Sequence, residues 1–445
     1  MLRSISQRFN VGVEKYLPDA FIFAIILTFI TYMMGIVLAG QTPLAMIEHW
    51  YSGFWNFLAF TTQMVMILVT GYCLVEAPVV KKMVNRLASL PKTQGSALSL
   101  TMLVAGIGGY ISWGLGFILG TLFAMEVARN VQKADYRILI AAAYTATIAI
   151  LPASITVTAP LLVNTPGHSL EESIGLIPLN QTIFGPMLLF VALVSFVLVI
   201  WAFRAMMPKE NEVIPFRHSG EIAASTDVPV REVPTTLAGK MEHSRLINTI
   251  LVVMGFTWVI MYFYKNGFNL ELNILNFIFL FLGLALHGSP ISYIRSITKA
   301  MPSASGIALQ FPFYAGIMGM MAGSGLIGII ANWFVSISNE HTFPLFSLIS
   351  ACIVNIFVPS AGGQWQIQGP VMVEAAKALN LTPAIAVNTV TIGDLVTNLL
   401  QPFFVLPALG LSGLSLKDIW GYCMVAMFII FFVAAIGVTF LPVSF

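Results

Sequence analysis

Charged side chains are scarce in this sequence, and their scarcity excludes a soluble globular protein. Asp, Glu, Lys and Arg make up 9% of the 445 residues, hydrophobic residues make up 58%, and the net charge is +2. The mean hydropathy is +0.88. Such a composition is typical of polytopic membrane proteins, whose helices need about 20 apolar residues for each crossing. We therefore expect an all-α polytopic membrane protein in a lipid bilayer.

Motifs that carry enzymatic chemistry are also missing. The chain has no His/Cys/Asp spacing typical of metal sites, no glycine-rich loop followed by lysine, and no G-x-S-x-G motif. Its three cysteines, Cys73, Cys352 and Cys423, each lie within an apolar run and are expected to be small core residues. We expect no enzyme activity, no cofactor, no bound structural metal and no nucleic-acid partner.

Eleven apolar runs organise the chain, and two of them do not fit a single crossing. The runs are 20–38, 54–75, 96–125, 138–163, 181–203, 246–264, 273–291, 306–336, 343–373, 383–411 and 419–441. Runs 96–125 and 343–373 are too long for one crossing and have polar or glycine-rich centres. From Val358 to Pro370 the second of them has no charge but many turn-forming residues. Irregular backbone survives in lipid only where it lines a protein cavity, so we predict a break from Pro359 to Gly369.

Basic residues indicate that run 96–125 returns to the side from which it enters. Lys81, Lys82, Arg86 and Lys92 precede it, and Arg129, Lys133 and Arg137 follow it. Lys and Arg concentrate in cytoplasmic loops, so both flanks are predicted to be cytoplasmic, as is the N-terminus. The run is then either a pair of spans or a re-entrant hairpin, and about 15 residues per arm fits the hairpin better. Its predicted turn is Gly108–Gly116.

Each predicted hairpin precedes a span with its own polar interruption, at 151–160 and 393–402. The same charge count makes run 343–373 enter from the outside, so the two hairpins open in opposite directions. This is the pattern of an inverted-topology repeat. We predict about 9–10 transmembrane helices, with the repeats and connections as follows: a first repeat 1–205 (hairpin 96–128, broken helix 138–163), a cytoplasmic loop 206–245, a linking span 246–272, and a second repeat 273–445 (hairpin 343–377, broken helix 383–411).

The four interruptions supply groups that bind a carboxylate: half-helix N-termini, small residues and polar donors. The candidates from the first repeat are Ser112, Gly114, Ser154, Thr156 and Thr158. Those from the second repeat are Ser360, Gly362, Gly363, Gln364, Thr397 and Asn398. Trp113 and Trp365, in the predicted turns, are candidate walls for a short apolar tail. The alternative interpretation is structural: a hydroxyl can bond the carbonyl four residues earlier, and a tryptophan can pack a hairpin tip.

Asp394 is an acid predicted deep within a span, beside a break. A lone carboxylate there is costly unless it faces a cavity, a cation or a proton pathway. It is therefore the candidate for holding a coupling ion, H⁺ or Na⁺; a local tie between half-helices is the alternative. No basic residue lies in the predicted site, which favours a monocarboxylate over a substrate with more charge.

Four stretches resemble the bacterial short-chain fatty acid transporter family: 355–370, 393–402, 112–116 and 159–168. The resemblance covers nearly the whole chain and implies uptake of monocarboxylates such as acetoacetate and butyrate across the bacterial inner membrane. The family is similar in turn to the ion transporter superfamily. That similarity implies two hairpins and two broken helices in inverted repeats, and often a homodimer whose substrate-carrying part moves by an elevator motion.

Together these observations predict a secondary-active carrier for a short-chain monocarboxylate, coupled to H⁺ or Na⁺ by alternating access. Two alternatives stay open: a dicarboxylate or amino-acid anion carrier of the same superfamily, and an uncoupled anion channel.

Overall fold

The structure is a computed structural model that describes residues 20–216, 236–400 and 403–445. The described residues are nearly all helical and include no β-strand. Among them, five segments are long and apolar enough to cross a membrane: Leu58–Glu76, Tyr136–Val163, Pro186–Ala205, Arg245–Asn266 and Leu416–Phe440. The predicted cytoplasmic N-terminus and the middle of the 206–245 loop lie outside the described residues.

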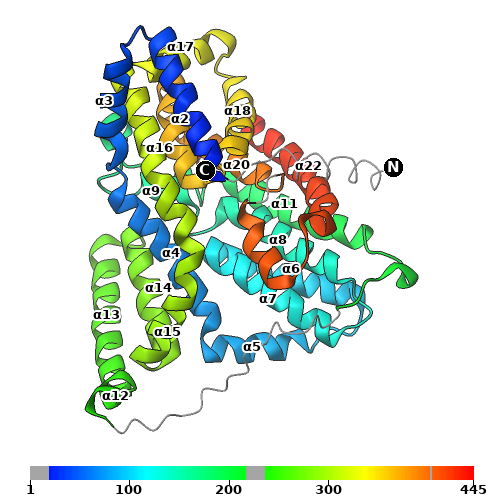
Figure 1. Cartoon of the computed structure of the whole chain (residues 1–445). Helices are drawn as coiled ribbons and strands as arrows, with labels where there is room; N and C mark the ends of the chain where they lie inside the picture. Colours follow the sequence, from blue (N-terminus) through cyan, green and yellow to red (C-terminus); the bar gives the residue numbers. More distant parts are fainter. Residues whose placement is uncertain (1–19, 217–235, 401–402) are drawn as a thin grey trace.

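The helices form two groups that lie side by side (Figure 1). The first group, here called the column, consists of α2 (Ala20–Val37), α3 (Pro43–Phe54), α4 (Leu58–Glu76), α13 (Arg245–Asn266), α14 (Leu272–His287), α15 (Pro290–Ala300), α16 (Ser305–Ser324) and α17 (Leu326–Ile337). Within it α16 packs on α2 and α3, and α4 packs on α14 and α15. The segment Pro290–Ser324, which ends with α16, meets α17 at a bend of 79° within the apolar run 306–336. Gly325 adopts a φ of 80° at the bend, a conformation that favours glycine.

The second group, here called the body, contains the predicted hairpins and broken helices. It consists of α6 (Gln94–Ile111), α7 (Trp113–Asn130), α8 (Tyr136–Ile150), α9 (Thr158–Val163), α11 (Pro186–Ala205), α18 (Phe343–Phe357), α19 (Ala361–Ala378), α20 (Pro383–Thr397), α21 (Leu406–Ser412) and α22 (Leu416–Phe440). The body meets the column where α4 packs on α7 and where α16 and α17 pack on α19. The short helix α5 (Pro78–Ala88) links α4 to the body.

Helices α6 and α7 pack against each other and are joined by the single residue Ser112. The predicted turn Gly108–Gly116 is therefore wrong in its extent. Its glycines serve helix contact instead: a Cβ on Gly116 would lie 2.6 Å from the Cα of Gly109. Small residues let helix backbones approach this closely.

The predicted break from Pro359 to Gly369 is also shorter than expected, because α19 already begins at Ala361. Only Val358, Pro359 and Ser360 separate α18 from α19. The glycines that suggested a long turn lie inside α19, and neighbouring aromatic rings explain them. A Cβ on Gly362 would lie 2.7 Å from the Phe60 ring, so a larger residue would displace that ring or the helix.

Both predicted broken helices contain a break. Helix α8 ends at Ile150, and a 3₁₀ turn, Leu151–Ala153, and an irregular stretch precede α9. Helix α20 ends at Thr397, and the described chain resumes with a 3₁₀ turn, Phe403–Val405, before α21. Each break leaves backbone groups without helical partners, and both breaks contribute to the cavity described below.

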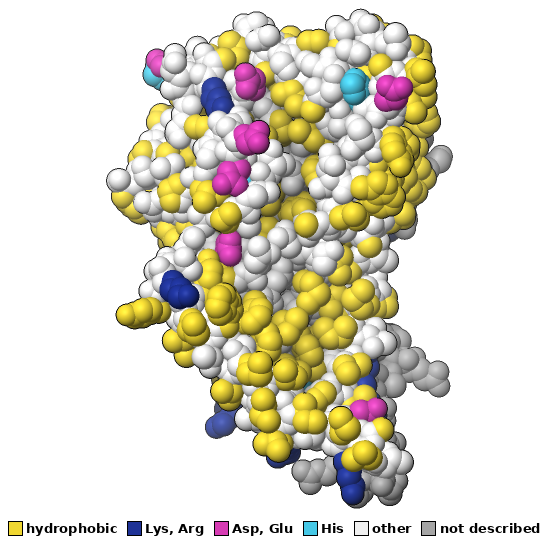
Figure 2. Space-filling view, turned by 90° about the vertical axis from the view of Figure 1, so that its left-hand side faces the viewer, with side chains coloured by type: hydrophobic (Ala, Val, Ile, Leu, Met, Phe, Trp, Pro, Cys, Tyr) yellow, Lys and Arg dark blue, Asp and Glu magenta, His cyan; other side chains and the backbone are white. Residues whose placement is uncertain are grey.

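Figure 2 shows the face of the molecule formed by the column. Hydrophobic side chains cover most of its lower half, as expected for a surface in contact with lipid. Most acidic side chains in this view lie in the upper half, and most Lys and Arg side chains gather at the lower end. The basic helix α5, with Lys81, Lys82 and Arg86, lies at the same end (Figure 1).

Candidate functional site

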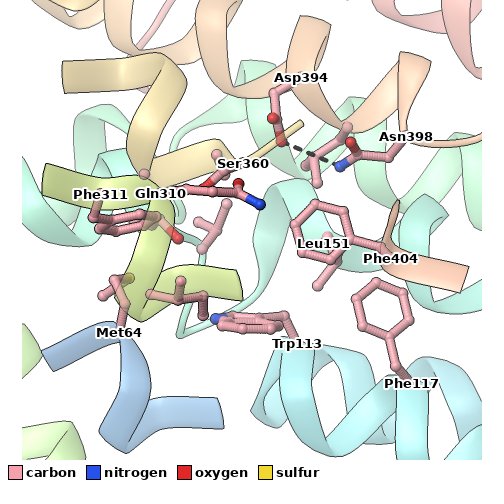
Figure 3. A pocket seen from close by; sticks show the side chains of 16 residues that line it. Met64, Trp113, Phe117, Leu151, Gln310, Phe311, Ser360, Asp394, Asn398 and Phe404 are labelled. Carbon is pink, nitrogen blue, oxygen red and sulfur yellow. Dashed lines mark hydrogen bonds between the residues drawn. The ribbon is translucent and has the colours of Figure 1, made fainter. Parts of the chain in front are cut away.

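A cavity of about 50 Å³ lies between the column and the body (Figure 3). The column contributes side chains from α4 and α16, and the body contributes the start of α7, both breaks and the start of α19. None of the sixteen described residues that line it is Lys, Arg or His. The space is thus mostly apolar, with few polar groups, as small-molecule sites usually are.

Several residues predicted from the sequence line this cavity: Trp113, Thr158, Ser360, Gly362, Asp394 and Asn398. They come from four elements that are far apart in the chain, namely α7, the first break with α9, the α18–α19 junction and α20. The remaining candidates do not line it: Ser112, Gly114, Ser154, Thr156, Gly363, Gln364, Trp365 and Thr397. Most of these have structural contacts instead.

The polar residues of the first break tie it to the tip of the α6–α7 pair. Thr156 Oγ1 accepts a hydrogen bond from the backbone N–H of Trp113 at 3.0 Å. Ser154 Oγ donates to the carbonyl of Tyr110 at 3.1 Å. Thr156 thus satisfies an N–H in the first turn of α7 that has no intrahelical partner, and it holds Trp113 at the cavity edge.

The second break is tied in a comparable way to α18. Asn355 Nδ2 lies 2.7 Å from the carbonyl of Asp394, 3.0 Å from Thr397 Oγ1 and 2.8 Å from Asn398 Oδ1. Thr397 Oγ1 also donates to the carbonyl of Cys352 at 3.1 Å. Asn355 and Thr397 are held within the helix packing, whereas Asp394 and Asn398 line the cavity.

Asp394 is the acidic residue of the cavity lining, and it is almost fully buried. Its side chain is 1% exposed. One carboxyl oxygen, Oδ2, accepts from Asn398 Nδ2 at 3.3 Å, while Oδ1 has no hydrogen-bond partner among the described residues. An ionised carboxylate in such a place is unfavourable without a cation or a proton.

The opposite wall contains a polar residue that the sequence reasoning missed, Gln310. It lies on α16, is 4% exposed, and extends its amide into the cavity (Figure 3). Its Oε1 accepts a hydrogen bond from Tyr314 Oη at 3.1 Å, so its amide nitrogen is available to a ligand. In the sequence, Gln310 is a polar residue in a largely apolar run, two residues before Pro312. That position could have indicated a site, but no predicted break lies next to it.

The start of α19 faces the same space. Ser360, Ala361 and Gly362 line the cavity, and Ser360 Oγ accepts from the N–H of Gly363 at 3.4 Å. The N-terminus of this 18-residue helix carries a partial positive charge from its aligned peptide dipoles. The cavity therefore places amide donors from α16 and α19 opposite the carboxyl group of Asp394.

The apolar lining was also missed, because tertiary packing brings it together. The body contributes Phe117, Leu151, Val157, Ala361, Leu395 and Phe404, and the column contributes Met64, Ile307 and Phe311. Trp113 and Phe404 meet edge to face, with ring centroids 6.2 Å apart. These side chains form an apolar pocket beside the polar groups.

The two tryptophans predicted as cavity walls differ in position. Trp113 lines the cavity, whereas Trp365 is 0% exposed and does not reach it. The Trp365 ring packs back on its own helix, where a Cβ on Gly369 would lie 2.8 Å from Trp365 Cδ2. Trp365 thus contributes to the packing of α19.

The loop between α9 and α11 secures α19 beyond the cavity. Ser169 Oγ donates to Gln366 Oε1 at 2.7 Å, and Lys377 Nζ donates to the carbonyl of Ser173 at 2.6 Å. Within the loop, burial lowers the pKa of His168. Its Nδ1 accepts from the N–H of Leu170, and its Nε2 faces the carbonyl of Gly175, to which Nε2–H donates.

Comparison with known proteins shows which family and which relatives this chain resembles. The profile of the family described as short chain fatty acid transporter matches residues 1–441. A curated relative from Haemophilus influenzae, named as a short-chain fatty acid transporter, is 38% identical over 99% of this chain and 100% of its own length. An Escherichia coli relative of the same name is 38% identical over 99% of this chain and 100% of its own length.

Two solved transporters share the architecture. The YdaH transporter of Alcanivorax borkumensis matches with a TM-score of 0.59 at 13% identity, over 95% of this chain and 98% of that one. Neisseria gonorrhoeae MtrF, described as illuminating a class of antimetabolite efflux pumps, matches with a TM-score of 0.51 at 14% identity, over 97% of each chain. At these identities the likeness concerns the fold alone, and that fold is one that transporters use.

Proposed function

Because the chain belongs to the short-chain fatty acid transporter family, we propose that this multi-pass membrane transporter takes up a short-chain monocarboxylate together with a cation. The observation that carries the proposal is the cavity itself, with amide donors on one side, the buried Asp394 on another and an apolar pocket between them. Transport of the acid needs all three parts.

The size of the cavity supports a small acid. A water molecule needs roughly 10–15 Å³ of such volume, so about 50 Å³ accommodates roughly three to five groups of that size. Acetate and propionate, with four and five non-hydrogen atoms, are in this range, and butyrate and acetoacetate, with six and seven, lie just above it. A dicarboxylate or amino-acid anion would bring further charge to a lining without Lys, Arg or His, and a second carboxylate without a cationic partner is costly to bury.

The placement of polar groups supports one orientation of the substrate. The carboxylate would meet the start of α19 and the amide nitrogen of Gln310, because helix N-termini and amide donors stabilise anions. The short tail would lie against Trp113, Phe117 and Leu151. Each buried methylene contributes about 0.8 kcal/mol, or roughly fourfold in affinity, until the pocket is full.

The position of Asp394 supports coupling to a cation. Moving an anion into a negative cell interior costs about 2.3 kcal/mol of electrical free energy for each 100 mV of membrane potential. Uptake therefore requires a compensating positive charge. Asp394 Oδ1 has no partner among the described residues, and it lines the same cavity as the donors. A proton or a sodium ion on this carboxyl would also remove its repulsion of the substrate.

Alternating access would come from motion of the body against the column, because the cavity lies between them. Under this proposal α6–α7 and α18–α19 are re-entrant hairpins of an inverted repeat, with the basic end at α5 on the cytoplasmic side of the bacterial inner membrane and the N-terminus on that same side. The similar ties that join each break to its neighbouring helix tip support the repeat. A homodimer remains the expectation from the superfamily resemblance.

Uptake of labelled butyrate into proteoliposomes tests the proposal. An inward gradient of H⁺ or of Na⁺, imposed separately at a negative internal potential, should drive accumulation above the equilibrium level with one of the two ions. Short acids also cross lipid as neutral molecules, so empty liposomes under the same gradients provide the baseline. Protein-dependent equilibration without accumulation would indicate an anion channel, and no protein-dependent flux would contradict carboxylate transport.

A further inference from the structure

Tyr314 lies behind the cavity wall, one helical turn after Gln310 on α16. Its side chain is 0% exposed, and its Oη donates to Gln310 Oε1 at 3.1 Å. Residues four apart on a helix lie on the same face, so the phenol can hold the amide oxygen beside the helix. The amide then extends its nitrogen toward the cavity (Figure 3).

The direction of this amide decides which ligand the wall recognises. The NH₂ group of glutamine only donates hydrogen bonds, and its oxygen only accepts them. An ionised carboxylate only accepts, whereas a primary amide both donates and accepts. A glutamine held nitrogen-first, together with the N–H groups at the start of α19, offers only donors. Such a set suits both oxygens of a carboxylate but leaves the NH₂ group of a primary amide facing a donor, whereas a glutamine free to rotate could turn its oxygen to that NH₂ group.

We propose that Tyr314 is a positioning residue that fixes the Gln310 amide with its nitrogen toward the cavity, and that it thereby makes the transporter select a carboxylate over a neutral amide of the same size. This inference deepens the proposed function and rests on it. Tyr314 does not line the cavity, so it acts on the substrate only through Gln310.

The packing of the Tyr314 ring supports this role. A Cβ on Gly363 would lie 2.6 Å from Tyr314 Cδ2 and 2.7 Å from Cε2, so the ring occupies the space that glycine leaves open in the first turn of α19. The ring therefore packs between α16 and α19, which keeps its hydroxyl beside the Gln310 amide. Gly363, predicted as a substrate contact, belongs to this support.

Competition binding measures the selectivity directly. Labelled butyrate is bound to the full chain in lipid nanodiscs and displaced by unlabelled butyrate or by butyramide, and the ratio of the two inhibition constants is recorded. The wild type should favour butyrate. Tyr314→Phe should lower the ratio by about threefold to tenfold, the contribution of one neutral hydrogen bond, because the freed amide can turn its oxygen to butyramide.

Tyr293→Phe is the matched control. Tyr293 is also buried, but its hydroxyl has no hydrogen-bond partner among the described residues, and it lies outside the cavity lining. Tyr293→Phe should leave the ratio of the two inhibition constants unchanged. Gly363→Ala, which displaces the Tyr314 ring, should reproduce the effect of Tyr314→Phe.

The outcomes separate this inference from the proposed function. If Tyr314→Phe weakens both ligands equally, Tyr314 has only a packing role and the inference is overturned. If that variant does not fold, Gln310→Met decides, because an unchanged ratio after loss of the amide overturns the inference as well. A wild type that binds no butyrate overturns the proposed function, and the inference with it.

Discussion

The two breaks of the body use their polar side chains differently. In the first, Ser154 and Thr156 both bond the tip of the α6–α7 pair. In the second, Asn355 and Thr397 form comparable ties, but Asp394 keeps one carboxyl oxygen without a partner among the described residues. Two breaks of similar construction thus differ in one ionisable group. Under the proposed function, the first half of the chain forms the shape of the site and the second half provides its charge.

The largest expected effect comes from removing that charge. Asp394→Asn keeps the size of the side chain and the contact with Asn398, but it can neither take up a proton nor neutralise the charge of a bound cation. We expect gradient-driven accumulation of butyrate to be lost, while butyrate binding and butyrate–butyrate exchange persist, because the donors of α16 and α19 are untouched. Uptake and counterflow in proteoliposomes, measured on the same preparation, separate the two activities.

Thr391→Val is the control on the same helix. Thr391 Oγ1 donates to the carbonyl of Val387 at 2.7 Å, and Thr391 does not line the cavity, so this variant should accumulate butyrate normally. Gradient-driven accumulation by Asp394→Asn at the wild-type level would show that the second break is as structural as the first.

A smaller effect is expected at the first break, on stability. Thr156→Val leaves the N–H of Trp113 without its acceptor, and an unsatisfied buried donor costs about 1–3 kcal/mol. Thermal unfolding in detergent should therefore occur at a lower temperature, while the order of preference among short acids stays the same. A wild-type melting temperature combined with lost butyrate binding would instead make Thr156 a substrate contact.

The sequence predicted where the chain is interrupted better than how far each interruption extends. The turns reduce to Ser112 and to Val358–Ser360, because glycine and glutamine are accepted inside a helix when packing requires it. Gly116 lets α6 and α7 touch, and Gly362 and Gly363 make room for Phe60 and Tyr314. Read without tertiary contacts, glycines of this kind look like a long turn.

The cavity shows the same limit of prediction. Asp394 stands out in the sequence because an acid in an apolar span is rare and costly. Gln310 lies in a span without a local break, and the apolar walls come from helices distant in the chain. Neither spacing nor composition indicates which apolar side chains will face a common space, because that depends on how column and body pack.

The smallest effect, and the sharpest contrast, is expected from one substitution made at two tryptophans. Trp113→Phe removes part of the cavity wall, so the acid of optimal length should become longer by about one methylene, with a gain of roughly fourfold for that acid. Trp365→Phe changes a buried ring that does not reach the cavity, and its Nε1 has no hydrogen-bond partner among the described residues. It should leave the series acetate, propionate, butyrate and hexanoate unchanged in competition assays. A shift of equal size in both variants would mean that α19 transmits packing changes to the tail pocket, and the division between a shape-forming half and a charge-bearing half would no longer hold.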